Sequence, residues 1–341
     1  MDLQTTWFIL LFVLLGGYAI LDGFDLGVGM LHLTGRTDGE RRLGLQAIGP
    51  VWDGNEVWLV TAGGALFAAF PFVYATVFSS MYLALYVLLV ALMGRAAAIE
   101  FRSKEESPAW RSAWDIIFFL GSLLPSILFG VALGNVLRGL PLEPVNGELR
   151  FTGDFLTLLN PFSIAVGVLS TLLFLLQGAI FLAMKSDGRQ QQRMRTLVPI
   201  FWMAVVVLYV VLSIYAMMRL PHLYDQIMGK GMFFVLLGVI CAAMLAVPLL
   251  TYSRRYGPAL VASSMIIGGM MALAAYGLFP RLVISTTGLA NSLTIRLHSA
   301  SPKSQLVMLI ITLMGMCFVI GYTLYVYRVF KGKTFVDPHG Y

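Results

Sequence analysis

Long apolar runs constrain the fold of this chain more than any other feature of its sequence. A helix needs roughly 20 predominantly apolar residues to cross a bilayer, and a helix satisfies its backbone hydrogen bonds internally, as lipid demands. The sequence therefore predicts an all-α integral membrane protein with nine spans, at about 7–30, 48–71, 72–99, 113–137, 158–184, 196–218, 231–252, 258–279 and 305–327.

The predicted spans form one unit. The 48–71 span is the least regular, because it begins with a polar cluster and becomes apolar only from Leu59 to Phe70. Connections are short, so we expect a single polytopic membrane domain over 1–341. The first span does not resemble a cleaved signal peptide, because no positive residues precede it and its apolar stretch is too long.

Composition narrows the class of protein further. Hydrophobic residues make up 59% of the chain and charged residues 12%, against about 45–50% and 25% in soluble domains. These values exclude a soluble enzyme, a disordered chain and a collagen-like rod. The net charge of +6 would suit a nucleic-acid partner, but basic cytoplasmic loops explain it better in a membrane protein. We expect no nucleic-acid partner.

The distribution of basic residues predicts the orientation. Most of the 23 lysines and arginines fall in one set of alternate loops, and such loops face the cytoplasm in membrane proteins. The N-terminus is therefore expected outside and the C-terminus in the cytoplasm, which requires an odd number of spans. This fits a multi-pass protein of a prokaryotic cytoplasmic (inner) membrane.

Charged residues inside the predicted spans gather in three successive helices. Asp22 and Asp25 lie near the end of the first span, Asp53 and Glu56 begin the second, and Arg95 and Glu100 close the third. With the assigned orientation, all six lie in the cytoplasmic third of their helices. Each acidic pair is spaced i,i+3, so its members share a helix face.

Two interpretations of these charges remain open. Any one of them could be an interfacial residue that caps a helix and marks the membrane boundary. Intramembrane charges are costly and commonly mark ion or proton pathways, so carboxylates with one arginine on adjacent helices favour a proton or ion path.

Gly23, Gly27 and Gly29 fit close helix packing. Trp52 fits the interfacial belt.

The sequence lacks the residue patterns that haem, metal or nucleotide binding would need. The four histidines, His32, His222, His298 and His339, fall in predicted loops or the tail, whereas a haem needs axial ligands inside its bundle. We therefore expect no haem or metal ligated by this chain. Cys241 and Cys317 lie in apolar runs without a Cys-x-x-Cys pattern. A nucleotide-binding glycine motif is also lacking.

Two function classes follow from the residues. One is a proton-conducting or partner subunit of a redox complex. The other is a proton- or ion-coupled secondary transporter with an acidic site built around Asp25 and Asp53. A transporter predicts broken helices at matching positions of two halves. Pro125 and Pro199 form no such pair, and no internal repeat is evident.

Several strings, in order along nearly the whole chain, resemble subunit II of the cytochrome bd-type quinol oxidases. The N-terminal strings are the most specific. The matching segments are 22–29 (DGFDLGVG), 52–59 (WDGNEVWL), 61–71 (TAGGALFAAFP), 100–104 (EFRSK), 110–111 (WR), 114–115 (WD), 134–135 (GN), 158–162 (LLNPF), 177–179 (QGA) and 291–294 (NSLT).

This resemblance implies a subunit of a terminal oxidase that oxidises quinol and reduces dioxygen to water. It implies a nine-span fold of two four-helix bundles plus one extra helix, and no catalysis by this chain alone. Low-spin haem b, high-spin haem b and haem d would belong to subunit I, the haem-bearing partner. A small single-span accessory subunit, membrane lipid and quinone are the other implied partners.

The resemblance also implies site residues. Asp53 matches the family's aspartate on a cytoplasmic proton path at the interface with subunit I, and Asp25 joins that path. Trp52 and Arg95 match the cluster at this interface near the haems, and we place Asp22 and Glu100 there. Glu56 stands where other members carry Gln, so its role is either proton transfer or hydrogen bonding.

Overall fold

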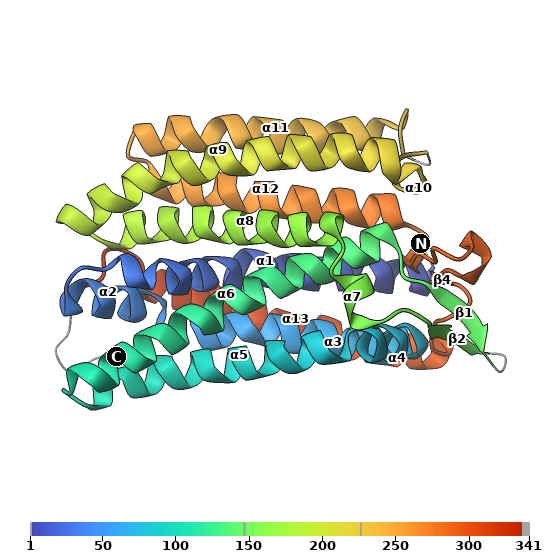
Figure 1. Ribbon diagram of the computed structural model, residues 1–341, viewed down its shortest axis with the longest axis horizontal. Coiled ribbons are helices and arrows are strands. Elements are labelled where there is room, and N and C mark those ends of the chain that lie inside the picture. Colours follow the sequence, from blue (N-terminus) through green and yellow to red (C-terminus); the bar gives the residue numbers. More distant parts are fainter. Residues whose placement is uncertain (1, 146–147, 226, 336–341) are drawn as a thin grey trace.

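The computed structural model describes residues 2–145, 148–225 and 227–335, and long helices lying side by side dominate it (Figure 1). Eight helices among these residues are long and apolar enough to cross a membrane. They are α1 (Leu3–Leu31), α5 (Tyr82–Phe101), α6 (Pro108–Arg138), α8 (Pro161–Lys185), α9 (Gly188–Arg219), α11 (Gly231–Tyr252), α12 (Tyr256–Leu278) and α13 (Pro302–Val329).

The predicted count of nine spans is not reproduced among the described residues. The 48–71 run forms α3 (Trp52–Ala69), an 18-residue helix whose polar first turn makes it less apolar than the other eight. The predicted 72–99 span is two helices, because α4 (Pro71–Ser80) ends before Met81 and α5 begins after it. Ser79 and Ser80 hydroxyls donate to backbone carbonyls just before this break, a competition that weakens a helix end.

Helix α8 crosses α1 and α6 at small residues. A Cβ added to Gly27 of α1 would collide with the carbonyl of Phe174, and Gly178 of α8 lies directly against Gly27. Gly23 packs against the Phe174 ring and Gly29 against Ser122 of α6. The glycines predicted to serve helix packing therefore do so, and they bring the backbone of α1 into the centre of the molecule.

Short elements close the two ends of the helical body. One end carries η1 (His32–Thr34), α2 (Asp38–Ile48) and η2 (Arg102–Lys104). At the opposite end, β1 pairs antiparallel with β2 and β3 with β4, and Leu140 bridges to Ser285 (Figure 1). The elements of that end are β1 (Leu142–Val145), β2 (Glu148–Phe151), α7 (Phe155–Leu158), α10 (Pro221–Tyr224), β3 (Arg281–Val283), η3 (Leu289–Asn291) and β4 (Leu293–Thr294).

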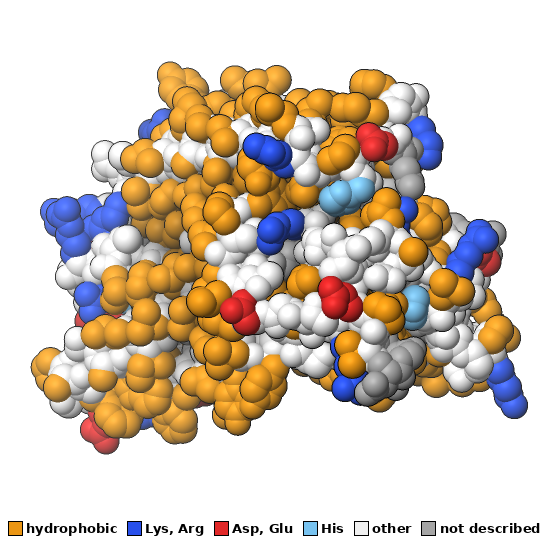
Figure 2. Space-filling view, turned by 45° about the vertical axis from the view of Figure 1, so that its right-hand side comes forward, with side chains coloured by type: hydrophobic (Ala, Val, Ile, Leu, Met, Phe, Trp, Pro, Cys, Tyr) orange, Lys and Arg blue, Asp and Glu red, His pale blue; other side chains and the backbone are white. Residues whose placement is uncertain are grey.

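The lateral surface is apolar. Figure 2 shows hydrophobic side chains over much of the side of the helical body, with lysines and arginines gathered mainly towards its edges. Large hydrophobic side chains such as Val60, Phe234 and Phe318 are exposed there. Exposed apolar area on this scale is unfavourable in water and suits contact with lipid or with another membrane subunit.

Candidate functional site

Arg95 lies at the centre of a buried ionic cluster. It is fully buried, and its guanidinium donates from both Nη atoms to the Asp22 carboxylate, at 2.7 and 3.0 Å. Nη1 also donates to Oε1 of Glu56 at 2.9 Å. The three residues come from α5, α1 and α3, so one side chain joins three helices. A bidentate arginine–carboxylate pair is the strongest geometry for such a contact.

Packing explains why Arg95 points inward. A Cβ at Gly121 of α6 would lie 2.9 Å from the Cβ of Arg95, so α5 and α6 approach closely on that side. On the other side, Asp22 and Asp25 follow one another at i,i+3 on the buried half of α1. The buried arginine therefore has a carboxylate within reach, and pairing with it offsets part of the cost of burying the charge.

Asp25 lies next to this cluster and has a different partner. Its side chain is fully buried, and its Oδ2 accepts a 2.7 Å hydrogen bond from Nδ2 of Asn55 on α3. Its Oδ1 is buried without a hydrogen-bond partner among the described residues. Tyr18, one turn before Asp22 on α1, likewise has a buried hydroxyl with no partner there. Unsatisfied buried polar atoms are rare, and each calls for an explanation such as a bound water, an ion or a catalytic role.

The charge balance of the site is the feature that decides its chemistry. Three carboxylates, of Asp22, Asp25 and Glu56, lie around the single guanidinium of Arg95. A buried charge without a partner costs several kcal/mol, so a carboxylate in excess is favourable only with a proton bound. The arrangement can therefore take up and release a proton without a large change in its packing.

The structure brings together four of the seven residues predicted for the site, namely Asp22, Asp25, Glu56 and Arg95. Trp52 is buried at the start of α3. Asp53 is exposed on the outer side of α3, about one turn before Glu56, whose side chain is 23% exposed. Glu100 is exposed near the end of α5 and makes no ion pair with the cluster.

Sequence reasoning missed three residues that complete the site. Asn55 lies in the 52–59 segment, but its role was not predicted. Its amide donates to Asp25 and also to the carbonyl of Leu21. Tyr327 of α13 donates to Asn55 Oδ1, and Gln177 of α8 donates to the carbonyl of Ile20. For Asn55 and Gln177, the available signal in the sequence was an amide side chain inside a predicted span. Nothing in the apolar 305–327 run distinguished Tyr327.

A second buried carboxylate lies nearer the α2 end. Asp115 of α6 is contacted by His32 Nε2, Arg41 Nη1 and Arg102 Nε, each at 2.5 Å. Arg102 also donates to Asp38 of α2. We call Asp115, His32, Arg41 and Arg102 the Asp115 cluster. It ties η1, α2, η2 and α6 together, and sequence reasoning had set His32 aside as a loop residue.

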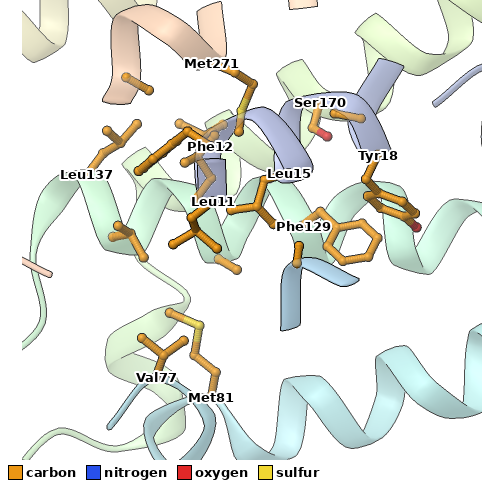
Figure 3. A pocket seen from close by; sticks show the side chains of 18 of the residues that line it. Leu11, Phe12, Leu15, Tyr18, Val77, Met81, Phe129, Leu137, Ser170 and Met271 are labelled. Atoms are coloured by element: carbon orange, nitrogen blue, oxygen red, sulfur yellow. The ribbon is translucent and has the colours of Figure 1, made fainter. Parts of the chain in front are cut away.

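A large apolar cavity adjoins the ionic site. Its volume is about 1110 Å³, and Leu11, Phe12 and Leu15 of α1 lie along it, with Met81 across from them (Figure 3). Tyr18 lies at its margin against the Phe129 ring, at a centroid distance of 5.1 Å (Figure 3). Because the lining is almost wholly apolar, we assign the cavity no step in proton transfer.

Metal-ligating residues do not gather into a group in the part of the chain that the structure describes. The described residues contain no group of three or more His, Cys, Asp or Glu that could hold a metal ion. Nε2 of His32 contacts Asp115, Nε2 of His222 the carbonyl of Leu137, and Nδ1 of His298 the backbone of Thr294. His339 lies outside the described residues. No step is therefore derived through a group bound to this chain.

Comparison with known proteins places these observations in a family. Residues 3–330 match the family model described as cytochrome bd terminal oxidase subunit II. The chain is 35% identical over 360 residues to cytochrome bd-I ubiquinol oxidase subunit 2 of Escherichia coli (strain K12), covering 97% of this chain and 95% of the relative. It is also 35% identical over 337 residues to cytochrome bd ubiquinol oxidase subunit 2 of Bacillus subtilis (strain 168), covering 97% of both.

A solved structure shares the fold. A chain of the bd oxidase from Geobacillus thermodenitrificans superimposes with a TM-score of 0.77 at 21% identity, over 97% of this chain and 99% of that one. This likeness supports the all-helical architecture.

Proposed function

Because the chain belongs to the cytochrome bd terminal oxidase subunit II family, we propose that its buried carboxylate–arginine cluster is part of the route by which protons reach the site of dioxygen reduction. The chain is a subunit of a quinol oxidase complex, an oxidoreductase of the respiratory chain. The haems and the quinol substrate belong to that complex. The secondary transporter is not favoured by these similarities.

The chemistry of the complex requires such a route. Reduction of dioxygen to water consumes protons together with electrons, and both must reach a site that is closed to bulk solvent. Helical membrane proteins carry protons through buried ionisable groups and water. The single observation that carries the proposal is the excess of carboxylates over cations around Arg95, because it leaves a site that exchanges a proton.

Asp53 and Glu56 supply the outer part of the proposed route. Asp53 is exposed on the side of α3, where a bare carboxylate would face lipid if nothing covered it. We place subunit I against this face, with Trp52 at the contact. One turn inward, Glu56 contacts Arg95, so a proton accepted at Asp53 moves along one helix face toward the buried cluster. Glu100, which is exposed, lies at the same interface in this proposal.

Asp25 is the inner acceptor of the proposed route. It is the carboxylate that no cation holds directly, and its Oδ1 is free to take or give a proton. Asp22, by contrast, is held by both Nη atoms of Arg95 and serves to fix and neutralise the arginine. Because carboxylates suit proton transfer when burial tunes them, the two aspartates divide the work between transfer and charge balance.

The remaining features of the complex extend the same proposal. We place low-spin haem b, high-spin haem b and haem d in subunit I, as the resemblance to the bd-type oxidase family implies. We propose a nine-span arrangement in which α3 is the additional span. An outer N-terminus and a cytoplasmic C-terminus agree with this count and with the distribution of basic residues among the loops. A single-span accessory subunit and bound lipid complete the assembly that we propose.

Replacement of Asp25 tests the function. In the complete complex, we expect Asp25→Asn to reduce quinol-driven oxygen uptake per haem by about 100-fold, since a positioned proton carrier typically contributes that much or more. Asp53→Asn should lower it as well, because Asp53 is the outer carboxylate of the proposed route. The matched control is Glu106→Gln, an exposed carboxylate outside the site. Undiminished uptake in Asp25→Asn, with normal haem spectra, would refute the proposal.

A further inference from the structure

The side-chain amide of Asn55 is fully engaged and can be placed in one way only. Nδ2 donates to Asp25 Oδ2 at 2.7 Å and to the carbonyl of Leu21 at 3.2 Å, while Oδ1 accepts from the Tyr327 hydroxyl at 3.2 Å. A backbone carbonyl can only accept, so the nitrogen must face Leu21. Asn55 is 2% exposed, and no bulk water can replace these partners.

Tyr327 reaches this amide from a helix that is otherwise almost unburied. In α13 only Gln305 and Val326 are buried. At one end of the helix, Trp7 Nε1 donates to the carbonyl of Gln305, and roughly 30 Å along α13 the Tyr327 hydroxyl meets Asn55. The Tyr327 ring lies edge-on to Phe24 of α1, at 6.5 Å between centroids. The phenol is thus oriented by the helix that carries Asp25.

These contacts form one line from α13 through α3 to α1. We propose that Asn55 and Tyr327 are positioning residues for Asp25: Tyr327 fixes the amide of Asn55, and Asn55 fixes the carboxyl of Asp25 with Oδ1 left free for proton transfer. The inference rests on the proposed function of the cluster and adds to it the group that sets the geometry of its inner acceptor.

An amide is suited to this role and unsuited to carrying the proton itself. Asn55 Nδ2 has no lone pair available for a proton, and both of its hydrogens are already donated. What Asn55 controls is the rotamer of Asp25 and the hydrogen bond that steadies its ionised form. Loss of the Tyr327 hydroxyl would free the amide to turn and would weaken that hydrogen bond.

The ionisable groups around Asp25 define what else could move its behaviour. They are Tyr18 and Asp22 on α1, Glu56 on α3, Arg95 on α5 and Tyr327 on α13. Arg95 is held by Asp22 and Glu56, so it does not hydrogen-bond Asp25. Asn55 is therefore the neutral donor whose removal changes Asp25 while leaving every charge of the cluster in place.

Tyr327→Phe in the complete oxidase tests the inference. It keeps the ring and removes one hydroxyl, so we expect quinol-driven oxygen uptake per haem to fall about two- to tenfold, the equivalent of one net hydrogen bond. We also expect the pH at which uptake is half-maximal to shift. Tyr325→Phe is the matched control, because Tyr325 is 67% exposed on the same helix; it should leave both unchanged.

The outcomes separate this inference from the proposed function. If Asp25→Asn slows uptake while Tyr327→Phe and Asn55→Ser both leave the rate per haem and the pH profile unchanged, the positioning role is wrong and the proton route stands. If Asp25→Asn has no effect, both are wrong. A role in packing alone would lower the yield of haem-containing complex without changing rate or profile. Should Tyr327→Phe fail to assemble, Asn55→Ser carries the same test.

Discussion

The chain contains two buried ionic clusters with opposite balances of charge. Around Asp115, three cationic or protonatable side chains surround one carboxylate. Around Arg95, the carboxylates of Asp22 and Glu56 accept hydrogen bonds from the guanidinium, and the carboxylate of Asp25 lies next to them. Both clusters join several helices through charge-assisted hydrogen bonds, yet they differ in what a proton can do there.

Under the proposed function, this difference separates a structural lock from a site of proton exchange. Both oxygens of Asp115 accept hydrogen bonds from cationic or protonatable donors, so neither carboxylate oxygen is left free. The Arg95 cluster leaves Asp25 Oδ1 free and has negative charge in excess. Buried ion pairs add little net stability over apolar packing, so we take the acid excess as a functional feature. The Asp115 cluster fastens α2 and η2 to the helix ends.

Arg95→Leu should have the largest effect, because it removes the cation of the Arg95 cluster. It leaves the buried Asp22 and the partly buried Glu56 without their cation, at a cost of about 3–5 kcal/mol. We expect little assembled complex, measured as haem per milligram of membrane protein. Asp22→Asn in the same chain should restore part of the yield, because it removes the stranded charge. Normal yield from Arg95→Leu alone would contradict the buried ion pair.

Asp115→Asn should destabilise the protein without slowing it. Among the described residues, the change leaves Arg41 and His32 without a charged partner and Arg102 with Asp38 alone, and we expect a loss of about 3 kcal/mol in unfolding free energy, measured as an earlier loss of haem absorbance on heating. Oxygen uptake per intact haem should stay as in the parent. If Asp115→Asn instead lowered uptake like Asp25→Asn, the division between lock and exchange site would fail.

Glu40 offers the smallest effect and a pH dependence that can be checked. Partial burial raises the pKa of this α2 carboxyl, but hydrogen bonds from the Arg36 amide and the Arg193 guanidinium outweigh it, so the pKa lies below its usual value. A lowered folded-state pKa means stability that is present above about pH 4.5 and is lost as the pH falls through the folded value.

Glu40→Gln should remove that contribution, about 0.5 kcal/mol for a partly exposed pair. Thermal unfolding followed from pH 7 down to pH 3 should show a smaller difference between variant and parent at the acid end. A difference that grows toward low pH would contradict this sign. Glu106→Gln, whose carboxyl is exposed, should show no such trend.

The sequence predicted the helices well and their interruptions poorly. Apolar length sufficed for α1, α6, α8 and the later helices, because lipid leaves few alternatives to a helix. The break at Met81 lies inside a continuous apolar run, and hydropathy carries no information about serine hydroxyls that bond back to the chain. The polar start of α3 was visible in the sequence, and the count of nine spans that includes this helix stays a prediction.

The site was predictable where neighbours in sequence suffice. The i,i+3 spacing placed Asp22 with Asp25, and a charge inside an apolar span identified Arg95. The spacing did not predict that Glu56 points inward while Asp53 stays exposed. Residues three apart on a helix differ by about 60° in direction, and only Glu56 extends inward to Arg95. Tyr327 lies 272 residues from Asn55, and contacts over such distances depend on tertiary packing that a single sequence does not display.

The two-point attachment of α13 also has a consequence for biosynthesis. Chains emerge from the ribosome from N- to C-terminus, so α1 and α3 are in the membrane before α13 is made. Until α13 arrives, Asn55 lacks the phenol that orients it, and Trp7 lacks the carbonyl of Gln305. Under the proposed function, Asp25 therefore acquires its fixed geometry only after α13 has inserted, so assembly of the proposed proton route depends on that helix.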